Sequence, residues 1–249
     1  MRHLTTRDKL IVTGLYLSKF DVDGLHALGF NGFQEAFNAI AFSLKAKPAS
    51  LKNYRDEFDP YFPNPRQGWH KRPIRNYCKE IMDEYEKLTI DDFATLLKKE
   101  ISVAGDIEII EEEVDLSGDN TFAKRLVTGQ AAEKYFEVAY NSLPEFQDFS
   151  LENTTRLGCG FDFKMNKDEF PFLAVEVKGM TSATGTIVLT SKEQKTAHYL
   201  GNRYYLFVVH NFIEKPYHTI YRNPLKSNLI FERRETSIVQ VSWSANIKG

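Results

Sequence analysis

The hydrophobic pattern of this chain changes between its two halves, and that change limits the folds the chain can adopt. Residues 6–100 repeat apolar side chains at the three- and four-residue spacing of amphipathic helices. Residues from about 145 to 245 instead show short, β-branched apolar runs with one clear helix among them. The sequence therefore predicts an all-α N-terminal domain followed by a mixed α/β (α+β) domain.

Six short helices are expected in the first half, over residues 7–20, 22–28, 33–44, 51–58, 73–88 and 90–100. Thr89 and Asp92 have the spacing of a capping arrangement at the start of the last helix. Short helices with tight turns are compatible with a helix-turn-helix or winged-helix DNA-recognition domain over residues 1–104. Small helical domains with other functions share this pattern, so periodicity alone does not decide the role.

An acidic stretch, residues 105–119, separates the two halves and ends in turn residues. We interpret it as a connector that contains a short strand at Ile107–Ile110. The second domain is then placed at residues 105–249, with the connector at its start.

Composition excludes several classes of protein. The chain is 42% hydrophobic and 27% charged, which is ordinary for a globular protein. No apolar run approaches the ~20 residues of a membrane span, and the N-terminus lacks the apolar stretch of a secretory signal. The two cysteines, Cys78 and Cys159, lie far apart, so we expect a cytoplasmic protein without a disulfide framework. A formal net charge of −2 argues against a purely electrostatic nucleic-acid binder but allows local basic patches.

One such patch is the segment 66–79, which contains five lysine and arginine residues and no acidic residue. Arginine and lysine contact phosphates, and aromatic side chains can stack on bases. We expect Trp69 to pack in the core and the cations to contact DNA phosphates: Arg66, Lys71, Arg72 and Arg75. The alternative interpretation is a solvated basic loop.

A strand-like segment over residues 172–178 carries two charges near its end. Side chains of a strand alternate between faces, so Glu176 and Lys178 point the same way and the two neighbouring valines point to the other face. Charges within an apolar strand are costly unless they have partners or a chemical role. Asp162 lies 14 positions before Glu176, in the preceding strand-like segment.

Phosphodiester hydrolysis explains this combination of residues. Asp162 and Glu176 supply the hard oxygen ligands that Mg²⁺ prefers, with Mn²⁺ as a possible substitute. A metal held there would polarise a scissile phosphate and lower the pKa of a bound water. Lys178 would orient that water or stabilise charge on the phosphate. Gly160 allows a close approach before Asp162. The alternative is a surface Glu-x-Lys pair on an edge strand with an unrelated aspartate.

The expected order of elements suits an α/β nuclease core: a helix over 122–141, strands over 149–153, 161–165, 172–178 and 186–189, a helix over 191–200 and a strand over 204–209. Ser191 is the expected N-cap of the second of these helices.

The pattern Asp162…Glu176-Val177-Lys178 resembles the PD-(D/E)xK, restriction-endonuclease-like nuclease superfamily, although Phe161 stands where the motif has proline. More narrowly, several blocks in order resemble the domain at the C-terminus of the plant protein NO VEIN, which also occurs in bacterial restriction and defence proteins. These blocks lie within residues 121–215: 160–162, 175–179, 187–190, Glu193…Ala197 and 204–209.

This resemblance implies a further acid on the preceding helix, for which Glu133 is the best match and Glu137 the rival. It also implies a polar side chain from the helix over 191–200, with Gln194 and Glu193 as candidates. The implied catalytic set is Asp162, Glu176, Lys178, Glu133 and Gln194, and the implied metal-binding set is Asp162, Glu176, Val177 and Glu133. The cations of the later helix are expected to touch the DNA backbone: Lys192 and Lys195.

The function that follows from the motif and the resemblance is a Mg²⁺-dependent DNA endonuclease of a prokaryote. We expect a restriction endonuclease, either type II-like or modification-dependent. It would act on double-stranded DNA as a homodimer or a DNA-induced dimer, because cutting both strands uses two active sites. The helical half, through its 52–59 run and Gly68-Trp69, resembles N-terminal domains of some restriction endonucleases. The alternatives are a catalytically silent DNA-binding or scaffold subunit of a defence system, a structure-specific repair nuclease, and an RNA-cleaving enzyme.

Overall fold

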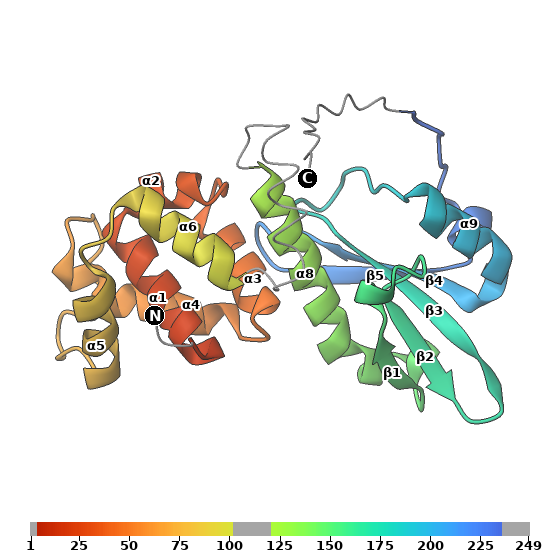
Figure 1. Ribbon diagram of the computed structural model, residues 1–249, viewed down its shortest axis with the longest axis horizontal. Coiled ribbons are helices and arrows are strands. Elements are labelled where there is room, and N and C mark those ends of the chain that lie inside the picture. The colour runs from red at the N-terminus through yellow and green to blue at the C-terminus, as the bar shows by residue number, and fades with distance from the viewer. Residues whose placement is uncertain (1–3, 102–120, 236–249) are drawn as a thin grey trace, which may run out of the picture.

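The computed structural model describes residues 4–101 and 121–235, with side chains from residue 127 onward in the second range (Figure 1). The N-terminal part is helical, and the C-terminal part holds a five-stranded mixed sheet. The acidic connector 105–119, its expected strand Ile107–Ile110 and the expected domain boundary all lie outside the described residues.

The six helices expected before residue 102 are all present. They are α1 (Thr6–Lys19), α2 (Asp21–Ala27), α3 (Phe33–Ser43), α4 (Pro48–Phe58), α5 (Asn76–Tyr85) and α6 (Ile90–Ile101), with a 3₁₀ turn, η1, at Asp59–Tyr61. Helix α5 begins three residues later than expected, because Arg75 before it is extended, with ψ of 141°. Helix α4 begins earlier, with Pro48 in its first turn, where a missing N–H costs nothing.

Helix α1 is the centre of the helical core. Its N-terminus is closed by a capping box, in which the Asp8 amide donates to Thr5 Oγ1 and the Thr5 amide donates to Asp8 Oδ2. From Leu10 to Ser18 every residue of the helix is buried. A helix covered on all sides needs neighbours on all sides, and α1 contacts α2, α4, α5 and α6. The expected cap of α6 is confirmed, since the Asp92 amide donates to Thr89 Oγ1 at 3.2 Å.

The sheet has the strand order β1-β2-β3-β4-β5. The strands are β1 (Ser150–Asn153), β2 (Phe163–Lys167), β3 (Phe170–Gly179), β4 (Tyr204–His210) and β5 (Tyr217–Arg222). Only β3 and β4 are parallel, and helix α9 (Ser191–Leu200) connects them. The other neighbours are antiparallel.

The strand expected over 186–189 is wrong, and strand β5 (Tyr217–Arg222) was not expected from the sequence. Residues 186–189 are not a strand, although Ile187 and Leu189 alternate in burial with their exposed neighbours. The two side chains pack beside Leu206 and Val208 of β4, but both edges of β4 already pair with β3 and β5, so the segment has no ladder partner. Sequence alternation reports which side chains are half-buried and does not report backbone pairing.

Two helices cover opposite faces of the sheet (Figure 1). Helix α8 (Thr121–Ala139) packs Ala132 and Phe136 into one core with Val175, Val177 and Phe207. Helix α9 packs Ala197 and Leu200 against Ala174 and Tyr204 on the other face. Adjacent residues of β3 therefore face different helices. No described helix is long and apolar enough to cross a membrane.

Helix α3 joins the helical part to the sheet part, because it packs along α8. The rings of Tyr135 and Phe212 both pack edge-on against Phe42. The buried Asn38 side chain donates from Nδ2 to the carbonyl oxygens of Phe212, at 2.6 Å, and Glu214, at 2.9 Å. The two parts are thus held together by both apolar and polar contacts.

Candidate active site at the end of strand β3

A pocket of about 540 Å³ opens at the carboxyl end of β3, between α8 and α9. It contains the three residues that the sequence singled out, Asp162, Glu176 and Lys178, and the residues that line it are Thr128, Gly129, Glu133, Asp162, Glu176, Val177, Lys178, Gly179, Thr181 and Glu193. The expected Glu133 lies on its wall, from α8.

Asp162 is held against β3 by two backbone hydrogen bonds. Its amide donates to the carbonyl of Val175 at 3.0 Å, the residue whose register partner is Phe163, and so holds Asp162 beside β3 just before β2 begins. Its Oδ2 accepts the amide of Val177 at 2.8 Å. The carboxylate is therefore anchored between Glu176 and Lys178. The Val177 side chain packs in the core, so this residue reaches the pocket with its backbone.

Two glycines let the neighbouring helices approach this strand end. Gly160 has φ of +87° and lies against Thr196 and the Lys192 carbonyl of α9, which confirms the expected close approach before Asp162. On the other side, a Cβ on Gly179 would lie 2.7 Å from the Thr128 carbonyl oxygen of α8. Larger residues at either position would push a helix away from the site.

Lys178 is the centre of the charged contacts in the pocket. Its Nζ lies 2.6 Å from Glu176 Oε1 and 2.9 Å from Glu193 Oε2. Glu193 also accepts the Thr190 amide at 3.0 Å and so completes a capping box at the start of α9. The N-cap is therefore Thr190 and not Ser191, because Thr190 has the residue that closes the box three positions later.

The electrostatics of the pocket follow from three acids around one ammonium. Burial, and then the charge of Asp162, raises the pKa of Glu176 to about 9. Burial also raises the pKa of Asp162 to about 6, although the Val177 amide opposes the change. Burial would lower the pKa of Lys178, but Glu176 and Glu193 together raise it. The pocket thus holds more carboxylate than one lysine can neutralise, which favours a further cation.

The carboxylates fit a hard divalent cation. Mg²⁺ is usually bound through one or two protein carboxylates, with water and phosphate oxygens completing its shell, and Asp162 with Glu176 matches that donor set. Among the described residues, no group of three or more His, Cys, Asp and Glu side chains is arranged to hold a metal. Glu133 therefore lines the pocket without forming a three-residue metal cluster with the other two acids.

The remaining residues expected on the sheet domain are placed differently from one another. Helix α9 turns Glu193 into the pocket, whereas Gln194 is exposed and does not line it. Lys192 and Lys195 are exposed on the same helix. The rival acid Glu137 is ion-paired with Lys45 and Lys134 outside the pocket. Glu193 has a sequence signal that identifies it, the Thr-x-x-Glu spacing of a capping box, whereas nothing in the sequence singles out Thr128 or Thr181.

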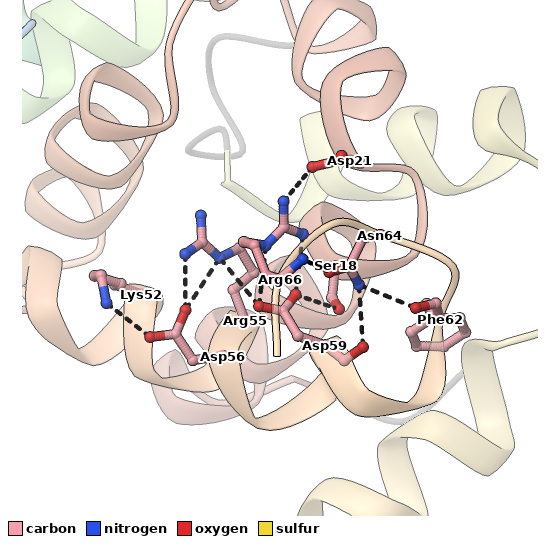
Figure 2. Close-up of polar contacts among 9 residues, drawn as sticks. All are labelled: Ser18, Asp21, Lys52, Arg55, Asp56, Asp59, Phe62, Asn64 and Arg66. Atoms are coloured by element: carbon pink, nitrogen blue, oxygen red, sulfur yellow. Dashed lines mark hydrogen bonds and ion pairs between the residues drawn. The ribbon is translucent and has the colours of Figure 1, made fainter. Parts of the chain in front are cut away.

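The basic segment of the helical half is only partly free. Figure 2 shows Arg66 among the carboxylates of Asp59 and Asp21, with the Asp59 side chain fully buried. Arg75 is bound by Glu57 in the same manner. These two arginines, expected to contact phosphate, instead join parts of the fold, because acids distant in sequence reach them. Lys71 is exposed, and Arg72 is half-exposed over the Trp69 ring.

The fold and the pocket define a mixed-sheet domain whose central strand ends in two acids and a lysine. Residues 132–222, from within α8 to the end of β5, match the family model described as Protein NO VEIN, C-terminal. The matched range contains the three central residues and Glu133, and it supports the family resemblance seen in the sequence. No curated protein and no solved structure was found to match the chain.

Proposed function

We propose that the protein is a Mg²⁺-dependent DNA endonuclease, and more narrowly a restriction endonuclease of a prokaryotic defence system, acting in the cytoplasm. The observation that carries this proposal is the position of Asp162, Glu176 and Lys178 on one pocket wall at the end of β3, with both acids held so that their pKa values are raised. The NO VEIN-type family match over the same residues supports it.

Asp162 and Glu176 would hold the metal ion, and the backbone of Val177 would fix the orientation of Asp162. When bound, Mg²⁺ or Mn²⁺ supplies charge that polarises a phosphate and acidifies a water. Lys178 remains charged at neutral pH, because its pKa is raised, and donates hydrogen bonds inside the pocket. A scissile phosphate that enters the pocket would meet this ammonium, which stabilises the negative charge that develops on its oxygens.

Glu193 and Glu133 have different roles in this proposal. Glu193 holds the Lys178 ammonium from α9 and is a positioning residue. Glu133 lines the pocket from α8 and would add negative charge beside the metal held by Asp162 and Glu176. Lys192 and Lys195, exposed on α9, would contact the phosphates that flank the cut. Two copies of the chain on one duplex would cut both strands.

Incubation of the full chain with plasmid DNA and Mg²⁺ tests the proposal. We expect nicked or linear product on methylated or unmethylated plasmid, and EDTA abolishes it. Glu176→Gln and Lys178→Ala lower cleavage by about a hundredfold or more, the scale of losing one preorganised charge from a transition state. Asp168→Asn, an exposed acid in the β2–β3 turn, is the matched control and cuts like the wild type. If the wild type leaves every plasmid intact, the restriction function is wrong.

A second candidate function is a DNA-binding or scaffold subunit that no longer cuts. The observation that favours it is the contact of Lys178 with two acids, together with the lack of a three-ligand metal group among the described residues. Such a subunit would slow the migration of duplex DNA in a gel-shift assay at any Mg²⁺ concentration and would not cut it. Branched, flapped and RNA substrates in the same cleavage assay identify a repair nuclease or a ribonuclease.

A further inference from the structure

A second pocket lies in the helical half, on the segment between η1 and α5. It has a volume of about 350 Å³ and is lined by residues 68–72, which are Gly-Trp-His-Lys-Arg. In Figure 1 this segment is at the end of the helical part that faces away from the sheet. It shares no lining residue with the candidate active site.

Buried ion pairs hold this loop in one shape. Arg66 before it donates from Nη2 to Asp59 Oδ1 at 2.9 Å and also reaches Asp21, while Ser18 donates to the same Asp59 at 2.8 Å (Figure 2). Arg75 after it is bound to Glu57, whose side chain is 2% exposed. The loop is therefore fastened at both ends to acids of α2, η1 and α4.

The loop is also fastened in the middle. The Trp69 amide donates to the carbonyl of Asp56 at 2.8 Å. Gly68 has φ of +50° and lies so close to the Asp56 carbonyl that a side chain would not fit. A loop fixed at three points does not need to be ordered again when a ligand binds, so less binding free energy is lost.

Two side chains of the segment are left over by these contacts, Lys71 and His70. Among the described residues, no hydrogen bond or ion pair engages Lys71 or His70, and both are exposed. The Arg72 guanidinium lies 3.8 Å from the centroid of the Trp69 ring and pairs with Glu57 at 3.7 Å between Nη2 and Oε2, and its side chain is still 47% exposed. The pocket thus has a guanidinium over an aromatic ring, with an exposed ammonium beside them.

Planar rings and guanidinium groups are the surfaces on which unstacked nucleobases lie, and lysine beside them suits the phosphate of the same nucleotide. A small-molecule pocket begins at about 300 Å³. We propose that this pocket, which we name the Trp69 pocket, binds one unpaired nucleotide of a DNA strand, with the base on Trp69 and Arg72 and the phosphate on Lys71. The inference rests on the proposed nuclease function, to which it adds a DNA-reading site separate from the site of cutting.

A base explains more of the pocket than its rivals do. An acidic peptide would pair with the exposed cations and would make no use of the Trp69 ring. A fully paired duplex offers phosphates but no base face, so it too would use only Lys71 and Arg72. A nucleotide with an unstacked base uses the ring, the guanidinium and the ammonium together.

The test uses the full chain in EDTA, so that no cleavage occurs. A labelled single strand, a perfect duplex and a duplex with one unpaired base are titrated by fluorescence anisotropy. A Trp243→Phe background leaves Trp69 as the one tryptophan, whose emission gives a second readout. We expect the single strand and the unpaired-base duplex to quench Trp69 and to bind more tightly than the perfect duplex. Trp69→Ala weakens that binding by about tenfold to a hundredfold, the scale of one stacked base.

Two further variants protect the test from misfolding. Trp69→Phe keeps a ring in place and retains most of the preference for an unpaired base. Lys71→Ala removes an exposed, unengaged ammonium, so the fold is unchanged, and it lowers the slope of log Kd against log salt by about one. Lys87→Ala, another exposed lysine of the helical half, is the matched control and changes neither quantity.

The proposal is overturned if Trp69→Ala and Lys71→Ala bind like the wild type, if all three DNAs leave Trp69 emission unchanged, or if an RNA of the same sequence binds more tightly than the DNA. Binding of the expected kind by a chain that never cuts would retain the Trp69 pocket and reject the nuclease. If the protein cuts DNA normally but its Trp69 emission does not change on adding DNA, only the proposal for the Trp69 pocket is rejected.

Discussion

Lys178 of β3 and Glu193 of α9 form an ion pair of 2.9 Å between Nζ and Oε2, in the lining of the candidate active site. The same glutamate oxygen accepts the Thr190 amide and starts helix α9. One side chain therefore sets both where the helix begins and where the lysine ammonium lies.

Removing this contact lowers cleavage more than it lowers stability. Glu193→Gln keeps a hydrogen-bond acceptor for the helix start but loses the charge that holds Lys178, so we expect kcat to fall about tenfold while DNA affinity stays within about twofold. Thr190→Ala is the control that removes only the cap. It costs about 1 kcal/mol of unfolding free energy and leaves kcat unchanged. Equal loss of kcat in both variants would show that Glu193 acts through the helix and not through Lys178.

The stability of the metal-free protein falls as pH rises. The carboxyl of Glu176 has its pKa raised from 4.5 to about 9, so between these values the folded state keeps a proton that the unfolded state has released. Stability from this group is complete below pH 4.5 and declines up to about pH 9. Thermal unfolding in EDTA from pH 5 to pH 9 measures the slope, and Glu176→Gln, which does not titrate, flattens it. A steeper slope in the variant would contradict the assignment.

Mg²⁺ acts in the opposite direction along the same pH range. Carboxylates must lose their protons to bind a metal. The pKa of Asp162 is raised to about 6 and the pKa of Glu176 to about 9. We expect the increase of Tm on adding Mg²⁺ to grow between pH 6 and pH 9 and to vanish in an Asp162→Asn, Glu176→Gln double variant. A Tm increase of the same size in that variant would place the metal elsewhere.

Gly179 and Gly129 make a matched pair for the packing of α8. An alanine at Gly179 would place its Cβ 2.7 Å from the Thr128 carbonyl, so we expect a loss of about 1–3 kcal/mol of unfolding free energy. An alanine at Gly129 meets nothing within 4 Å and lies inside a helix, so it stabilises by about 0.5–1 kcal/mol. Urea unfolding measures both. The opposite order would mean that α8 does not lie against the end of β3 as described.

Substitutions at Arg66 and Lys71 distinguish a cation that stabilises the fold from a cation that is exposed in the same basic segment. Arg66→Ala leaves the fully buried Asp59 carboxylate without that partner and costs about 3–5 kcal/mol of unfolding free energy. Lys71→Ala changes stability by less than about 0.5 kcal/mol, because the side chain is exposed. Chemical denaturation compares them directly. A neutral Arg66→Ala would return that arginine to the group available for phosphate.

Much of this molecule was predictable from local patterns. The helices before residue 102 follow from apolar spacing and from caps such as Thr89 with Asp92, because these signals are satisfied within a few residues. Strand alternation alone predicts that Glu176 and Lys178 lie on the same face of the strand. A single residue, Gly160, likewise predicted the close approach of the chain before Asp162.

Other features were beyond the reach of local patterns. The run over 186–189 alternates like a strand but finds no free edge, since β5 occupies the other side of β4. From the sequence, Arg66 and Arg75 are candidates for phosphate contact. Helix packing brings Asp59 and Asp21 to Arg66, and Glu57 to Arg75. The choice between Glu193 and Gln194 depended on how α9 is rotated over the sheet.

The sequence by itself determined which residues are candidates for the proposed chemistry, because the charges of Asp162, Glu176 and Lys178 stand out within apolar, strand-like segments. The tertiary structure decided what surrounds them: Glu193 on the lysine, Glu133 on the pocket wall that α8 provides, and which cations of the basic segment remain exposed. The reason is that charge and periodicity are local properties of a chain. Ion pairing and burial depend on residues that only the packing of helices against the sheet brings within a few ångströms.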